Sequence, residues 1–176
     1  SVPNAKELDV LLSAGEQVTI ALLAMTLIKF GYNATSLTGW QAGITTDSEH
    51  NHATVKKVDT DKINAMLAAD NIVIIAGFQG VDEDNQITTL GRGGSDTSAV
   101  SLAGFLSAKE CQIFTDVDGV FRCDPRVVHH AEKLAKILLM PPRRDTATKT
   151  SIAPLYSQGF SSRHGSNYLH IRNIKT

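Results

Sequence analysis

The chain of 176 residues lacks the features that mark membrane, secreted or nucleic-acid-binding proteins. Its 17 basic and 18 acidic residues nearly cancel, so no excess of positive charge is available for a phosphate backbone. No apolar run approaches the length of a membrane span, and the chain does not open on a basic segment followed by an apolar one. We therefore expect a cytoplasmic protein that binds neither nucleic acid nor membrane.

Cysteine and metal-binding patterns are equally sparse. Cys111 and Cys123 have no motif spacing, which is typical of reduced thiols rather than of a disulfide. His50 and His52 lie in a polar loop, and we interpret them as solvated surface residues, so no metal site is predicted. The chain also has no Walker A pattern, which excludes the common P-loop mechanism.

The residues that are present indicate a globular domain with alternating strands and helices. A 42% hydrophobic content over this length supports one substantial core. Such alternation predicts an α/β fold, a three-layer sandwich in which helices cover both faces of a mostly parallel sheet. Helices are expected at 8–32, with a small-residue break at 13–16, at 62–69 and at 99–108; strands are expected at 34–37, 54–58, 72–76 and 112–115, and a hairpin at 82–85.

A glycine-rich turn at 88–99 carries the strongest chemical signal. It follows the apolar run 72–76, which we interpret as a strand buried on both faces, and it leads into a helix that Ser95 or Asp96 would cap. Free amides at the start of that helix and the fork-shaped cation of Arg92 suit a phosphate or carboxylate. Asp96 would repel phosphate, which suggests that it organises something cationic.

A second group of charged residues follows the strand at 112–115. In open parallel sheets ligands bind beyond the carboxyl ends of the strands, so both turns are expected to line one site. Acids and arginines around an anion-binding turn suggest a nucleotide with magnesium. The alternative is a set of Asp-Gly turns without a ligand. The residues of this second group are Asp116, Asp118, Asp124 and Arg126.

Five motifs, in order, resemble the kinase domain of aspartokinases, which belong to the amino acid kinase family. The resemblance covers residues 5–137. It implies an amino acid kinase-like fold and ATP-dependent phosphorylation of the aspartate side chain, with Mg²⁺, as the first step toward lysine, threonine, methionine and diaminopimelate. The motifs are LSAGEQ at 12–17, TGWQAGI at 38–44, AGFQG at 76–80, TLGRGGSDTSA at 89–99, and FTDVDGVF at 114–121 with DPR at 124–126.

The resemblance also implies roles for individual residues. Glu16 would hold the amino group of the substrate aspartate, and Arg92 would hold its carboxylate. Ser95 would contact the substrate, and Asp96 would orient the catalytic groups at a transfer site formed with Arg92, Gly93 and Gly94. The nucleotide-binding positions would be Thr115, Asp116, Phe121, Asp124 and Arg126. For Phe121, the alternative is a buried core residue.

The chain departs from the family pattern at both ends of this region. Relatives begin with a strand and a KFGGTS segment whose lysine contacts the phosphates, and this sequence starts after it. With that strand and helix missing, we expect exposed apolar sheet surface, association into a homo-oligomer and weak phosphate transfer. We therefore divide the chain into a partial kinase domain at 1–137, an atypical segment at 138–167, and a return to the kinase domain at 168–176.

The atypical segment has two open explanations. Relatives form a helix here, whereas Pro141 and Pro142 followed by several threonines do not. A loop insertion is one reading. A frameshift is the other, because starting one base later within a permitted coding sequence for 143–148 gives Asp-Glu-Ile-Leu-Gln-Leu and restores the helix.

Two other functions stay open beside aspartate phosphorylation. One is phosphorylation of another carboxylate or of a nucleotide by a member of the same superfamily, against which the motifs at 12–17 and 38–44 argue. The other is a non-catalytic remnant that serves as a binding or assembly partner, which the missing lysine segment favours.

Overall fold

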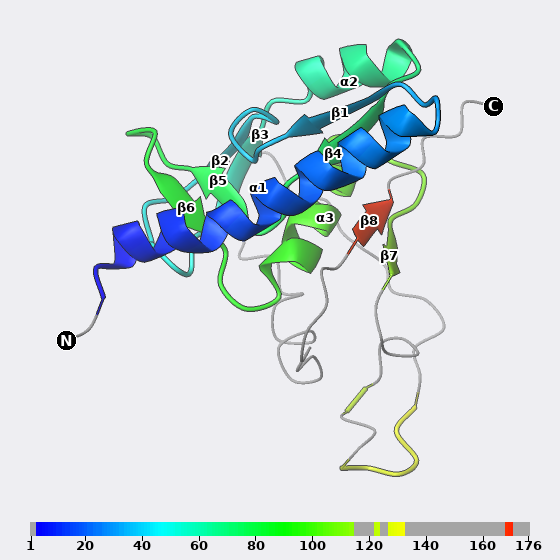
Figure 1. The fold of residues 1–176 in the computed structure, drawn as a ribbon. Coiled ribbons are helices and arrows are strands. Elements are labelled where there is room, and N and C mark those ends of the chain that lie inside the picture. The colour runs from blue at the N-terminus through cyan, green and yellow to red at the C-terminus, as the bar shows by residue number, and fades with distance from the viewer. Residues whose placement is uncertain (1–2, 115–121, 124–126, 133–167, 171–176) are drawn as a thin grey trace. The chain divides into compact units, whose positions relative to one another are not determined.

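The computed structural model describes residues 3–114, 122–123, 127–132 and 168–170 (Figure 1). The chain divides into two compact units, Ser1–Ser98 and Ala99–Thr176. In chain order the elements are α1 (Ala5–Lys29), β1 (Ala34–Leu37), β2 (Ile44–Thr46), β3 (Val55–Val58), α2 (Asp61–Ala68), β4 (Ile72–Ile75), β5 (Gln79–Val81), β6 (Ile87–Thr89), α3 (Gly94–Phe105), β7 (Gln112–Phe114) and β8 (Tyr168–His170).

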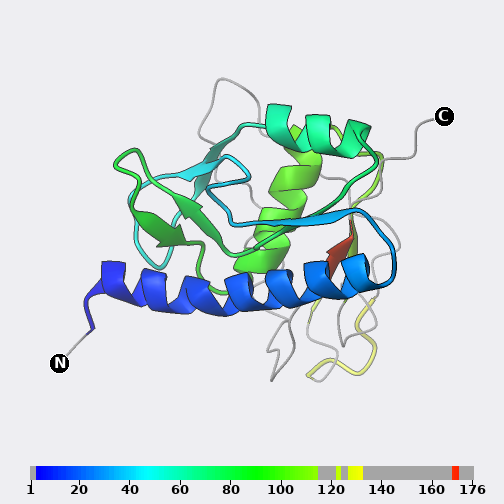
Figure 2. The same ribbon diagram turned by 45° about the horizontal axis from the view of Figure 1, so that its top comes forward.

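The first unit has the alternating architecture that the sequence predicts. β1 and β4 pair in parallel, with Ala34 opposite Ile72. This pair lies between α1 and α2 in both ribbon views (Figures 1 and 2). A second sheet has the strand order β3-β2-β5-β6, in which β2 and β5 are parallel and the other two pairs are antiparallel. The α/β class is therefore confirmed, and the antiparallel pairs come from short hairpin connections.

Helix α1 begins and ends on local signals. The Asn4 side chain accepts hydrogen bonds from the backbone amides of Lys6 and Glu7, at 3.0 and 3.2 Å. The break expected at 13–16 was wrong, because α1 runs through it without interruption. The Ser13 hydroxyl donates to the Val10 carbonyl at 2.9 Å, so this small polar residue is satisfied within the helix.

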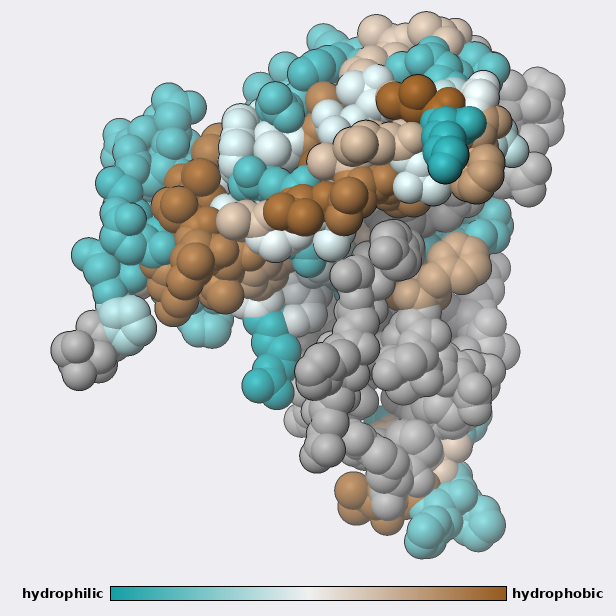
Figure 3. All heavy atoms as spheres, viewed as in Figure 1, coloured by the Kyte–Doolittle hydropathy of each residue, from teal (hydrophilic) through white to brown (hydrophobic). Residues whose placement is uncertain are grey.

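Most of the large apolar side chains of α1 are exposed. Asp9, Ser13, Ile20 and Ala24 are its buried residues, and their spacing places them on the face toward the sheet. Figure 3 shows apolar surface gathered along the helix. The exposed side chains include Leu11, Leu12, Val18, Leu22, Met25 and Ile28. The apolar surface expected on the sheet is thus found mainly on this helix.

This composition corrects one expectation about the sequence. By length and apolar content alone, the 25-residue α1 could cross a membrane, although no run of that length was expected. The core helix of a soluble protein passes the same test, so the finding by itself is weak evidence of a membrane span.

Strand β4 is less buried than its sequence suggests. Ile72 is 38% exposed and the following three residues are half-buried, whereas Ala76 just beyond the strand is fully buried. The prediction of burial on both faces was therefore wrong for β4. Among the described residues β1 is its only strand partner, which leaves its other side without a neighbouring strand.

The hairpin predicted at 82–85 connects β5 and β6. The Asp82 carboxylate accepts hydrogen bonds from the backbone amides of Gln86 and Asp84, at 2.8 and 3.0 Å. The Gln86 amide is the main cause that lowers the pKa of Asp82 below its ordinary value. Local turn chemistry thus sets this connection, as its Asp and Asn residues indicate.

The second unit contains the rest of α3 and the antiparallel pair of β7 and β8, in which Ile113 lies opposite Leu169. β8 falls within the strand pattern expected at 168–173. Arg122 and Glu132 form an exposed ion pair, with 2.9 Å between Nε and Oε2.

Candidate functional site

The glycine-rich turn joins β6 directly to α3. Gly91 and Gly93 have φ angles of 76° and 74°, a left-handed conformation that glycine adopts without strain. The Gly93 carbonyl accepts from the Thr97 amide at 3.1 Å. The helix therefore begins at Gly94, earlier than expected. The prediction that Ser95 or Asp96 caps the helix was wrong, because both residues lie inside its first turn.

The turn packs against the AGFQG segment, in unit 1 as well. The Leu90 amide donates to the Phe78 carbonyl at 3.0 Å, and the Phe78 amide donates to the Ser98 hydroxyl at 2.8 Å. A Cβ on Gly94 would lie 2.6 Å from a ring carbon of Phe78, and one on Gly77 would lie 3.2 Å from the Ser95 Cα. Glycine at these two positions lets the segments touch.

Phe78 was not singled out by the sequence analysis. Its φ of 68° is unusual for a bulky residue. Backbone strain of this kind is held by surrounding structure and is common at functional sites. Its position between glycines in the AGFQG motif was the only signal in the sequence.

Two acids of the predicted site, one buried and one half-buried, have no hydrogen-bond or ion-pair partner among the described residues. Asp96 is 7% exposed and Glu16 is half-buried on α1. Burial raises the pKa of both carboxyls above the ordinary values. Within the part of the chain that the structure describes, no hydrogen bond or ion pair reaches either side-chain carboxylate. An arriving cation would stabilise the charged form of each.

The other two buried acids of the described residues, Asp82 and Asp9, accept several hydrogen bonds. Asp82 accepts two backbone amides, as described above. Asp9 is completely buried and accepts hydrogen bonds from His50, Asn51 and Thr89. Such donors satisfy a buried carboxylate, whereas Glu16 and Asp96 have no such donor among the described residues.

The remaining predicted residues are distributed over the same turn. Arg92 and Gly93 are exposed, Gly94 is buried and Ser95 is half-buried. Helix α1, which carries Glu16, is tethered to the AGFQG segment by Gln79, whose Nε2 donates to the Ser13 carbonyl at 3.1 Å. The structure therefore brings Gly94 and Ser95 next to the segment to which the helix of Glu16 is tied.

The predicted nucleotide-binding residues lie outside the described residues. These are Thr115, Asp116, Phe121, Asp124 and Arg126. They stay predictions, as does their proximity to Arg92 and Asp96.

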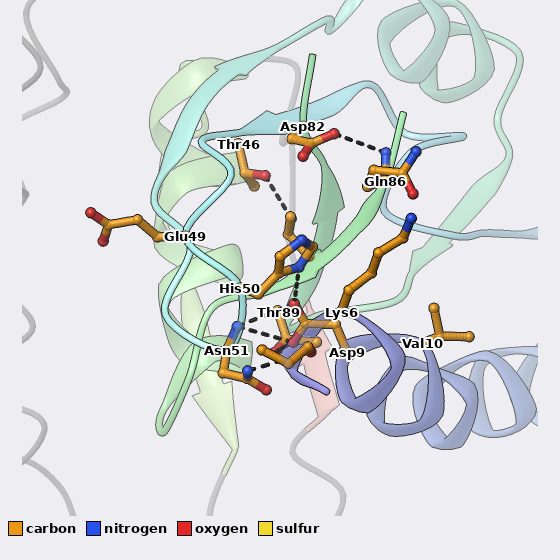
Figure 4. Close-up of polar contacts among 12 residues, drawn as sticks. Lys6, Asp9, Val10, Thr46, Glu49, His50, Asn51, Asp82, Gln86 and Thr89 are labelled. Carbon is orange, nitrogen blue, oxygen red and sulfur yellow. Dashed lines mark hydrogen bonds and ion pairs between the residues drawn. The ribbon is translucent and has the colours of Figure 1, made fainter. Parts of the chain in front are cut away.

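The interpretation of His50 as a solvated residue was wrong. Its Nδ1 lies 2.8 Å from Oδ2 of Asp9, and its side chain is only 21% exposed (Figure 4). The loop at 47–53 folds back onto α1, a contact that no local pattern indicates. Among the described residues, no group of three or more His, Cys, Asp or Glu side chains is arranged to hold a metal ion.

Comparison with known proteins places the chain in a family. It belongs to the amino acid kinase family, which matches residues 2–153. It is 58% identical over 135 residues to an aspartokinase of Geobacillus stearothermophilus and 60% identical over 135 residues to an aspartate kinase of Pseudomonas putida. Both matches cover 77% of this chain and 33% of the relative, so the chain spans about a third of the curated relatives' length.

A solved structure supports the fold. E. coli aspartokinase III in complex with aspartate and ADP superposes with a TM-score of 0.67 at 30% identity, covering 76% of this chain and 30% of the other. The amino acid kinase-like fold and the resemblance to aspartokinases are thereby confirmed.

Proposed function

We propose that this chain supplies the substrate side of a site that transfers phosphate from ATP to the side-chain carboxylate of aspartate, giving 4-phosphoaspartate. The observation that supports this most directly is that the buried Asp96 and the half-buried Glu16 have no hydrogen-bond or ion-pair partner for their carboxylates among the described residues. The similar E. coli enzyme was solved with aspartate and ADP, which supports the choice of substrates.

The substrate has one ammonium and two carboxylates, and the site offers matching charges. Glu16, whose half-buried carboxylate has no partner among the described residues, would bind the ammonium group. Arg92 is exposed at the glycine turn, and its planar guanidinium suits the α-carboxylate. Ser95 adds a hydroxyl beside Gly77. These contacts would present the side-chain carboxylate for attack on the terminal phosphate of ATP.

Transfer itself depends on positioning and on stabilising charge that spreads over the phosphate oxygens. The glycines at 93 and 94 leave room for close approach to the backbone. Asp96 would orient cationic groups at the transferring phosphate. A bound Mg²⁺ would offset phosphate charge, and a buried carboxylate such as Asp96 is the kind of oxygen ligand it prefers. The nucleotide would be held by the predicted residues at 115–126.

Hydroxylamine trapping of aspartyl phosphate tests this function. We expect ATP-dependent and aspartate-dependent product, and its loss in the Asp96→Asn variant. A form extended by a KFGGTS-type leader measures how far transfer depends on the expected lysine. If neither form makes aspartyl hydroxamate from any concentration of aspartate, the proposal is wrong for this chain. The cytoplasmic location and homo-oligomeric state stay predictions.

A further inference from the structure

Asp9 is the most highly connected buried acid in the described first unit. It is fully buried on α1. Its Oδ1 accepts from the Thr89 hydroxyl at 2.5 Å and its Oδ2 lies 2.8 Å from His50 Nδ1. The Asn51 amide lies 3.1 Å from both oxygens. Figure 4 shows these groups converging on the carboxylate from two other segments of the chain. One side chain thus joins three segments that are far apart in sequence.

The two segments that Asp9 joins to α1 also touch each other. The Ala53 amide donates to the Thr89 carbonyl at 2.9 Å. A Cβ on Gly91 would lie 2.8 Å from both the Asn51 carbonyl oxygen and the His52 Nδ1. The loop at 47–53 therefore lies directly against the glycine turn, next to the residue that precedes Arg92.

Asp9 shares a helix face with Glu16. The positions 9, 13 and 16 are separated by four and three residues, so they lie above one another on α1. Ser13, between them, accepts the Gln79 hydrogen bond described above. Two tethers thus hold this face: Asp9 to the end of β6 and Ser13 to the start of β5.

From this geometry we propose that Asp9 is a positioning residue that sets the spacing between Glu16 on α1 and Arg92 in the glycine turn. Its carboxylate fixes where the helix sits relative to Thr89, three residues before Arg92. The substrate part of this inference rests on the proposed function, because Glu16 and Arg92 are there assigned to opposite ends of aspartate. The other part of the inference, which we call the mechanical part, is that Asp9 orders the glycine turn, and it does not depend on any ligand.

Hydrogen exchange of the turn amides tests the mechanical part. In Asp9→Asn the amide NH₂ cannot accept from all the donors, so exchange at the hydrogen-bonded amides of Ala53, Leu90 and Gly94 around the turn should accelerate by about tenfold or more. Asp82→Asn is the matched control, because it also removes the charge of a buried aspartate that accepts backbone amides. It should speed exchange at the β5–β6 hairpin and near Ser48, which also hydrogen-bonds Asp82, but not at Leu90 and Gly94 of the glycine turn.

A pair of Thr89 variants keeps the test decisive if Asp9→Asn fails to fold. Thr89→Val removes the hydroxyl and keeps the shape, whereas Thr89→Ser keeps the hydroxyl. Faster exchange at the turn in the valine variant and unchanged exchange in the serine variant support the positioning role. Turn exchange that stays at the wild-type rate in Thr89→Val, and in Asp9→Asn where it folds, overturns it.

Binding of aspartate and of ADP to the folded variants tests the substrate part. We expect Asp9→Asn to lower the affinity for aspartate by about tenfold or more and to leave the affinity for ADP unchanged. Equal loss for both ligands would mean general collapse and would overturn the positioning role. If the wild-type chain binds no aspartate, the proposed function fails, and hydrogen exchange alone still decides whether Asp9 orders the turn.

Discussion

The backbone amide of Phe78 donates a 2.8 Å hydrogen bond to the Ser98 hydroxyl, which in turn donates to the Gly94 carbonyl at 2.9 Å. This relay ties a residue with a positive φ to the first turn of α3. Because Ser98 is only 1% exposed, water cannot replace the hydroxyl. The strained backbone at Phe78 is therefore held by a partner twenty positions later in the chain.

Ser98→Ala should destabilise the protein more than its small size suggests. It leaves the Phe78 amide without an acceptor, so we expect the free energy of unfolding to fall by about 1–3 kcal/mol. Denaturant unfolding measures the change. Thr97→Ala is the control, because the exposed Thr97 hydroxyl only donates to the carbonyl of Gly93, just before the start of its own helix. Equal effects of the two substitutions would contradict the structural role of the relay.

Alanine substitutions at two helical glycines should have opposite effects. In Gly94→Ala the new Cβ would meet the Phe78 ring at 2.6 Å and the Leu90 Cβ at 3.0 Å. We expect a loss of about 1–3 kcal/mol from this overpacking. At Gly15 a Cβ would meet nothing within 4 Å, so Gly15→Ala should stabilise by about 0.5–1 kcal/mol. Thermal unfolding of both variants checks the difference in sign.

Asp96→Asn should change the pH dependence of the free energy of unfolding without destabilising the protein near neutral pH. Burial raises the folded-state pKa of Asp96, so the folded state binds more protons than the unfolded state above the ordinary pKa of about 4. Stability of the wild type is therefore lost as pH rises from that value through the folded pKa. The asparagine variant lacks this loss, so it should be at least as stable as wild type near neutral pH.

The same variant should lose turnover by about a hundredfold or more. Unfolding curves from pH 3 to 8 and the hydroxylamine assay provide the two measurements. A variant that unfolds much more easily at neutral pH but keeps turnover per folded molecule would show that Asp96 is structural.

Charge removal at Glu16 or Arg92 should affect the amino-acid substrate selectively. Glu16→Gln leaves the aspartate ammonium without a counter-charge, and Arg92→Gln does the same to the α-carboxylate. Each substitution should lower the affinity for aspartate by about tenfold or more and change the affinity for ADP little. Calorimetric titration with each ligand measures both affinities. Parallel loss of both would indicate a distorted fold instead of a lost contact.

Much of the local structure follows from sequence patterns. The strand at 34–37 appears as predicted, the helices at 62–69 and 99–108 are shifted toward the N-terminus by one residue and by several, and the hairpin lies at 82–85. These elements depend on neighbouring residues: apolar periodicity, turn-forming Asp and Asn, and glycine at positive φ. The motif order also carried the family resemblance.

The sequence by itself determined most of the elements, the glycine turn and the set of acids and arginines to be considered, but it did not indicate β2. Only the tertiary structure decided which acids are partnered. Asp9 and Thr89 are 80 positions apart and Asp9 and His50 are 41 apart, so no local spacing predicts that these donors satisfy Asp9. The tertiary structure also decided that most large apolar side chains of α1 are exposed. Burial and pairing depend on which distant surfaces meet, and the chain-local pattern of apolar and charged residues does not contain that information.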